Sequence, residues 1–129
     1  MSNIFSKIIS GEIPCHKVAE DDLHLAFLDI NPVAYGHTLV IPKMGIDYIF
    51  DMSDESLTNL MLFSKKVAKA LKKVVDCKKI GVSVIGLEVP HAHVHLIPIN
   101  AIQDMTFGKS IGISQADLTA LANKIATNF

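Results

Sequence analysis

The stretch Pro90-His91-Ala92-His93-Val94-His95-Leu96-Ile97-Pro98 carries the strongest structural signal in the chain. Histidines alternate in it with apolar residues, and alternate residues of a β-strand point to the same face of a sheet. The pattern therefore predicts a strand over His91–Ile97, with three imidazoles on one face and Ala92, Val94 and Leu96 in a core on the other. Prolines at both ends fit a short strand with defined limits.

Three interpretations of the aligned imidazoles remain open on the residues alone. The first is a histidine-rich strand at the surface. The second is a zinc site, because neutral imidazole is a common zinc ligand, although a closed structural site needs a fourth ligand. The third is catalysis at phosphorus, in which one imidazole attacks and another protonates the leaving group.

The rest of the chain alternates helical and strand patterns. Apolar spacing predicts a short helix that ends at Ser10-Gly11, a long amphipathic helix with Ser53 as its N-cap, and a last helix that begins at Ser114. A helix between two groups of strands indicates an α+β domain with a mainly antiparallel sheet. The strands are predicted at Cys15–Ala19, Leu23–Ile30, His37–Ile41, Ile80–Ile85 and His91–Ile97.

Size and composition limit the classes of function. The 129 residues fit one domain over 1–129, and half of them are hydrophobic. A formal net charge of -1 makes a nucleic acid polymer an unlikely partner, and no apolar run reaches the roughly 20 residues that span a bilayer. Cys15 and Cys77 match no metal spacing and no signal peptide is visible, so we expect free thiols and a cytoplasmic location.

The N-terminal half carries a second set of motifs, including Gly11-Glu12-Ile13-Pro14, Ala26-Phe27-Leu28-Asp29-Ile30 and the segment from His37 to Lys43. Together with the histidine strand, these blocks resemble the histidine-triad (HIT) superfamily, in its Hint-like branch of purine nucleotide-binding hydrolases. The resemblance covers residues 1–100 as a core and leaves 101–129 as a tail and helix. It implies a HIT-like fold with a five-stranded sheet, a long helix packed on that sheet, and a homodimer.

The resemblance also implies a role for each site residue. His93 matches the nucleophile that attacks the α-phosphorus and forms a nucleotidyl-histidine, which water resolves. His95 matches the residue that donates a proton or hydrogen bond toward the leaving group, and His91 and His37 match histidines that orient the nucleophile. Asp29 matches the carboxylate that binds the ribose hydroxyls. The base pocket is expected at Phe5, Ile8, Phe27, Leu28 and Ile30, and the phosphate end at Glu88 and Val89.

The predicted function is therefore that of a nucleotide hydrolase or transferase that needs no cofactor. Its substrates would be purine nucleoside phosphoramidates or phosphoesters of the AMP or GMP type. Two alternatives stay open: a dinucleoside polyphosphate hydrolase, and a nucleotide-binding sensor or adaptor with little turnover.

Three departures from the family pattern affect these expectations. Asn3 and Ser6 stand where many relatives have a cysteine pair that helps to bind zinc, so we expect no structural zinc. Leu87 stands where a glutamine is usual, in a shortened loop. Glu88 takes a place often held by a hydroxyl residue that touches phosphate. Because a carboxylate facing the phosphate would oppose binding, we expect Glu88 to turn away, toward a lysine.

Overall fold

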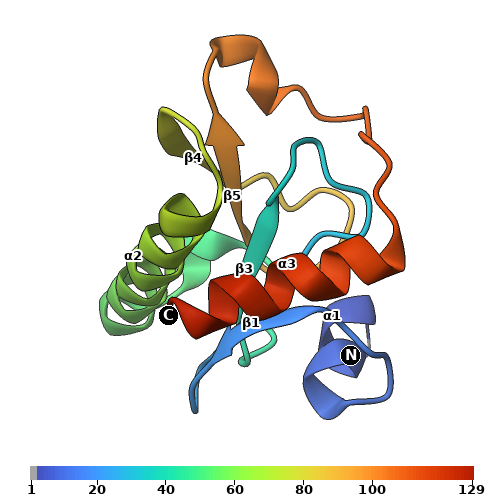
Figure 1. Cartoon of the computed structure of the whole chain (residues 1–129). Coiled ribbons are helices and arrows are strands. Elements are labelled where there is room, and N and C mark those ends of the chain that lie inside the picture. The colour runs from blue at the N-terminus through green and yellow to red at the C-terminus, as the bar shows by residue number, and fades with distance from the viewer. Residues whose placement is uncertain (1–2) are drawn as a thin grey trace.

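A five-stranded antiparallel sheet in the order β1-β2-β3-β5-β4 forms the frame of the computed structural model, which describes residues 3–129 (Figure 1). The sheet and its helices confirm the predicted α+β class. The strands are β1 (Lys17–Glu20), β2 (His24–Leu28), β3 (Thr38–Pro42), β4 (Lys79–Ser83) and β5 (Val94–Ile99).

Three α-helices and two short 3-10 helices complete the fold. They are α1 (Ile4–Ser10), α2 (Asp54–Val74), α3 (Gln115–Thr127), η1 (Ile49–Asp51) and η2 (Ile102–Met105). Ser53 is the N-cap of α2 as predicted, and Ser114, the predicted start of the last helix, is the N-cap of α3. Their side chains accept from the backbone N–H groups of Ser56 and Asp117. In the part of the chain that the structure describes, no helix combines the length and apolar character needed to cross a membrane.

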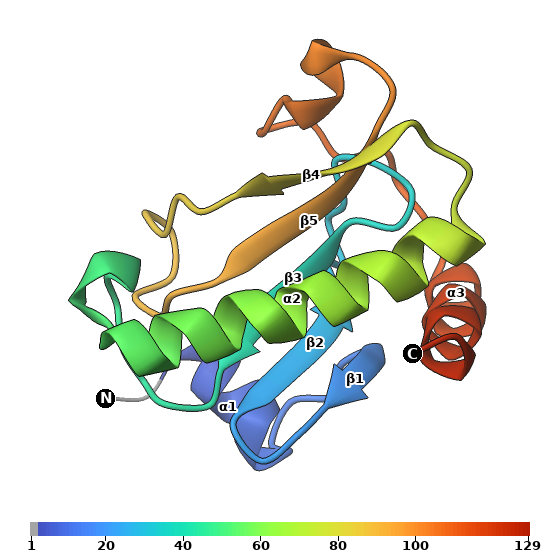
Figure 2. The same ribbon diagram turned by 90° about the vertical axis from the view of Figure 1, so that its left-hand side faces the viewer.

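The two faces of the sheet are covered differently. Figure 2 shows α2 lying across one face while α1 lies on the other. On the α2 face, Val40, Val94 and Leu96 pack with Leu60 and Leu71 in the larger core. On the opposite face, a smaller cluster joins Phe5 of α1 to four strand residues: Leu25, Phe27, Leu39 and Ile41. The histidines share this second face, because His95 lies opposite Leu39 in the β3–β5 register.

The histidine strand differs from its prediction at both ends. β5 begins at Val94, so His91 and His93 precede the strand, and it continues through Pro98 to Ile99. The late start has a physical cause: the Ala92 N–H donates to the Ile46 carbonyl and not to a neighbouring strand. Pro98 is tolerated because the β3–β5 ladder has ended by then, at Leu96. The other strand boundaries differ from their predictions by one or two residues.

Gly36 tightens the turn that delivers His37 to the sheet. Its φ of +94° lies in the left-handed region, and an added Cβ would lie 3.0 Å from Val75 Cγ2 and 3.1 Å from Leu71 Cδ1. A side chain at this position is therefore opposed both by backbone strain and by the packed core.

We expect Gly36→Ala to lower the free energy of unfolding by about 2–4 kcal/mol, combining left-handed strain with overpacking. Gly11→Ala is the matched control, since Gly11 has φ +87° but no atom within 4 Å of an added Cβ. The control should lose only the strain contribution, about 1–2 kcal/mol. Urea denaturation of both variants measures the difference, and equal losses would contradict the packing argument.

Candidate active site

A cavity of about 320 Å³ opens on the sheet face that carries the histidines. Its walls come from α1, from the end of β2 and from the loop before β5, which the fold brings together from distant parts of the sequence. Every residue predicted to contact the nucleotide lines it, together with His93 and His95. These residues are Phe5, Ile8, Phe27, Leu28, Asp29, Ile30, Glu88 and Val89.

Phe5 ties the apolar wall to the histidines. Its ring lies edge-on to Phe27, with ring centroids 5.7 Å apart, and to His93 at 4.9 Å. A capping box holds the start of its helix: Asn3 Oδ1 accepts from the Ser6 N–H, and Ser6 Oγ accepts from the Asn3 N–H. Asn3 and Ser6 therefore bond to each other at the start of α1.

His93 has its tautomer set by the main chain. Its Nδ1 lies 2.8 Å from the carbonyl oxygen of His91, which can only accept, so Nδ1 carries the proton. In the neutral ring, Nε2 then holds a free lone pair. His93 is 6% exposed and lines the cavity, so this lone pair belongs to a nearly buried ring at the cavity wall.

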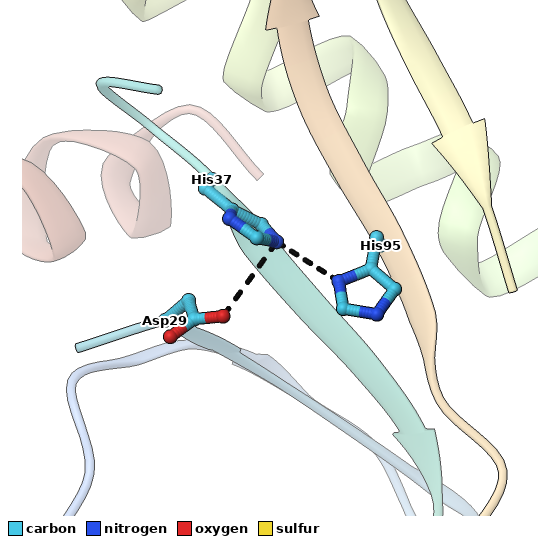
Figure 3. A group of neighbouring side chains, drawn as sticks. All are labelled: Asp29, His37 and His95. Carbon is cyan, nitrogen blue, oxygen red and sulfur yellow. Dashed lines mark hydrogen bonds and ion pairs between the residues drawn. The ribbon is translucent and has the colours of Figure 1, made fainter. Parts of the chain in front are cut away.

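His95 has its tautomer set through a longer chain of hydrogen bonds. The Val33 N–H donates to His37 Nδ1 at 3.1 Å, so the neutral His37 ring carries its proton on Nε2. His37 Nε2 donates to His95 Nδ1 at 2.9 Å (Figure 3). His95 must then carry its own proton on Nε2. The second nitrogen of His95 is therefore a hydrogen-bond donor for a ligand in the cavity.

Asp29 completes this group from the loop after β2. Its Oδ2 lies 3.7 Å from His37 Nε2 (Figure 3). Its Oδ1 accepts from the Asn31 N–H at 2.8 Å. One carboxylate oxygen thus shapes the loop, while the other faces the imidazole pair. Asp29 lines the cavity that the base-pocket residues line, as a ribose-binding role requires.

Asp29, His37 and His95 are also the one group of potential metal ligands found within residues 3–129, with their ligand atoms within 4.8 Å of one another. The hydrogen bond from Val33 makes them a poor metal site. A metal on His37 Nε2 would move the ring proton to Nδ1, where it would face the Val33 N–H. The donor pattern fits a hydrogen-bond chain and does not fit a bound cation.

His91 lies outside the cavity. It is fully buried and its Nε2 donates to the Pro42 carbonyl at 2.7 Å, while its Nδ1 has no hydrogen-bond partner within the described residues. The resemblance implies that His91 helps to orient the nucleophile. In the structure, the contact between His91 and the His93 ring is made by the main-chain carbonyl of His91.

Burial keeps the imidazole pair neutral. Desolvation, followed by the nearby His37 and His93, lowers the pKa of His95 to about 3. Burial also lowers the pKa of His37, although the Asp29 carboxylate opposes that shift. His95 therefore acts in the unliganded protein as a neutral N–H donor and not as an imidazolium.

Contrary to the expectation, Glu88 has no lysine partner. Its side chain is exposed and lines the first cavity, and no lysine nitrogen lies within 4.0 Å of it in the described part of the chain. The lysine cluster from Lys65 to Lys73 belongs to α2, which packs on the opposite face of the sheet. Glu88 therefore has no nearby cation on α2 to draw it away from the cavity.

A second cavity, of about 360 Å³, adjoins the first and shares Asp29, Asn31, Glu88 and His95 with it. His37 and Val33 line it as well, and its remaining wall is residues 107–110 of the C-terminal tail. Sequence analysis missed this wall because the tail carries no motif. The only local signal is an aromatic residue, Phe107, beside a glycine.

Comparison with known proteins identifies the family of this chain. The family model of the HIT domain matches residues 10–102. The chain belongs to the HIT domain family. Adenosine 5'-monophosphoramidase hnt1 of Schizosaccharomyces pombe is 38% identical to it over 133 residues, covering 98% of each chain. An uncharacterized HIT-like protein of Borreliella burgdorferi is 44% identical over 102 residues, covering 74% of this chain and 73% of the relative.

Solved structures of this family have the same fold. A HIT-like protein from Bartonella henselae is 37% identical and superposes with a TM-score of 0.83, covering 99% of this chain and 97% of that one. A HIT family member from Bacillus subtilis is 33% identical with a TM-score of 0.76, covering 100% and 98%. Family and relatives together support a nucleotide hydrolase activity.

The low pKa of His95 predicts a stability that depends on pH. A histidine whose pKa is lowered on folding binds protons more readily in the unfolded chain. The contribution of His95 to the free energy of unfolding is therefore constant above about pH 6.5 and falls as the pH drops toward 3. At pH 5 the His95 contribution is a loss of about 2 kcal/mol relative to pH 7. Urea denaturation at both pH values measures it.

His95→Asn should remove most of the loss in free energy of unfolding between pH 7 and pH 5, because asparagine does not titrate. An unchanged pH dependence in the variant would show that His95 is not held neutral by the fold.

Proposed function

We propose that this protein hydrolyses purine nucleoside phosphoramidates, with phosphoesters as a secondary class, through a nucleotidyl intermediate on His93. One observation carries the proposal. The His91 carbonyl holds the proton of His93 on Nδ1, which leaves the Nε2 lone pair free beside the His95 ring, whose centroid is 4.9 Å away. A nucleophile fixed in its reactive tautomer next to a hydrogen-bond donor is the arrangement that in-line attack on phosphorus needs.

The reaction divides into two balanced steps. His93 Nε2 attacks the α-phosphorus, the bond from phosphorus to the leaving nitrogen breaks, and the leaving amine takes up one proton from the solvent. Water then attacks the same phosphorus, the bond to Nε2 breaks, and the attacking water releases one proton to the solvent. In both steps the His95 Nε2–H donates to a phosphate oxygen or to the leaving atom and stabilises the charge that develops there.

The nucleotide cavity provides the binding for this reaction. Aromatic and aliphatic side chains make most of its wall and suit a purine base. Asp29 lies between this wall and the histidines, where its free carboxylate oxygen would accept from ribose hydroxyls. The name of the S. pombe relative, an adenosine 5'-monophosphoramidase, supports adenosine as the nucleoside.

The second cavity favours an amine as the leaving group. Its walls carry two carboxylates, Asp29 and Glu88, against a single ammonium, Lys109, while burial lowers the pKa of both His37 and His95. A leaving nucleotide with several phosphates would be repelled by this net negative surface. The charge balance therefore supports a phosphoramidase over a dinucleoside polyphosphate hydrolase.

His93→Ala should keep nucleotide affinity within about threefold and lower kcat by at least 10³-fold, the scale expected when a nucleophile is removed. Steady-state kinetics on an adenosine phosphoramidate and calorimetric binding of AMP measure the two effects. His16→Ala is the matched control, because His16 is a histidine outside both cavities.

Wild-type turnover in the His93 variant would exclude the mechanism. Tight AMP binding without any turnover in the wild-type protein would support the sensor or adaptor alternative.

We propose further that the protein is a homodimer joined through β4. This strand is at one edge of the sheet. Exposed apolar side chains lie on it, on the loop after it and on η1: Val82, Leu87 and Phe50. An edge strand with apolar neighbours favours pairing with another chain. Light scattering should give twice the chain mass for the wild type, and Val82→Lys should shift it toward the monomer. A monomeric wild type would contradict the proposal.

A further inference from the structure

The tail contributes an aromatic ring to the imidazole pair. The Phe107 ring lies edge-on to His95, with centroids 4.9 Å apart and planes at 73°, and edge-on to His37 at 6.3 Å and 78°. Phe107 therefore borders both partners of the hydrogen bond from His37 Nε2 to His95 Nδ1. No predicted role covers this residue, which lies beyond the segment that carries the HIT motifs.

The position of the ring is fixed from both sides. Figure 1 shows the segment between η2 and α3 running past the loop between β2 and β3, and the Ile111 N–H donates to the Pro32 carbonyl at 2.9 Å. On the other side, Asp104 Oδ2 accepts from the Asn100 and Ala101 N–H groups, which holds η2 against the end of β5. Gly108, with φ +92°, makes the left-handed turn directly after the ring.

Phe107 belongs to the second cavity and not to the first. Residues 107–110 line the compartment next to the histidines, and none of them lines the cavity that would take the nucleoside. The ring is 36% exposed, so part of it covers the imidazole pair and part faces the compartment. A substitution of Phe107 should therefore affect His95 and the departure of the leaving group more than it affects nucleoside binding.

We propose that Phe107 is a positioning residue whose ring shields the His37–His95 hydrogen bond from water. The shielded hydrogen bond keeps the His95 Nε2–H directed at the part of the substrate that lies where the two cavities meet. Without the ring, water would reach His95 Nδ1 and compete with His37 for it. A hydrated His95 would also accept a proton more readily, because burial is what chiefly opposes its charge.

Charged and titratable groups from every neighbouring element bear on this titration. His37 before β3 and His93 before β5 lower the pKa of His95. The other charged side chains that line the adjoining cavities are Asp29 after β2, Glu88 before β5 and Lys109 of the tail. Since Phe107 substitutions leave all five in place, a changed titration of His95 reports the loss of the ring itself.

Nitrogen NMR of the histidine rings tests the proposal directly. In the wild-type protein the His95 ring should stay neutral from pH 5 to 8, and in Phe107→Ala it should titrate within that range. Phe107→Tyr keeps the ring and should restore the wild-type behaviour. Ile102→Ala is the matched control, because Ile102 is an exposed apolar residue of the same tail that lines neither cavity.

Kinetics provide a second readout, which rests on the proposed function. Phe107→Ala should lower kcat about tenfold or more and change KM less than about threefold, since a positioning residue acts on chemistry more than on binding. If the alanine variant does not fold, Phe107→Leu replaces it, with a smaller effect of the same sign.

The outcomes separate the two proposals. An unchanged His95 titration in a folded Phe107→Ala variant overturns the positioning role, as does an equal change in the Ile102→Ala control. A raised KM at unchanged kcat also overturns it, because Phe107 would then be a wall that binds substrate. A wild-type protein without phosphoramidase activity refutes the proposed function alone, since the NMR titration still decides the role of Phe107.

Discussion

The hydrogen bond from His93 Nδ1 to the His91 carbonyl is the interaction on which the account of this site depends. It sets which nitrogen of His93 carries the proton, and so whether Nε2 can attack phosphorus. A second main-chain group, the Val33 N–H, sets the proton position in His37 and through it in His95. Two backbone groups thus give two adjacent imidazoles opposite roles, one as a lone-pair donor and one as a hydrogen-bond donor.

The fold makes these backbone groups available. Main-chain groups inside a sheet are normally taken up by neighbouring strands. Because β5 starts at Val94, the carbonyl of His91 is free to bond to a side chain two residues later. The apolar alternation continues through this break, since Ala92 and Val94 both lie in the larger core. The site therefore combines the rigidity of a core strand with a main-chain acceptor that a longer strand would have used elsewhere.

Local patterns predicted much of this structure. Alternation placed the imidazoles on the face opposite Val94 and Leu96, and the serine caps placed the starts of α2 and α3. The resemblance to the HIT superfamily named residues that line the first cavity. The predicted limits of β5 were wrong because its backbone hydrogen bonds depend on its partners in β3 and β4. Contacts between residues far apart in the sequence, such as that of Phe107 with His37, leave no periodic pattern in it. Whether Glu88 has a lysine partner depends on where α2 packs.

Intact-protein mass spectrometry on rapidly quenched mixtures with an adenosine phosphoramidate tests the central claim most directly. The account predicts a transient increase in mass by one adenylyl group, mapped by acid-free fragmentation to His93. It also predicts that the adduct decays at the rate of turnover. Turnover without any adduct on a millisecond time scale, or an adduct on His91 or His95, would contradict the tautomer assignment and the mechanism built on it.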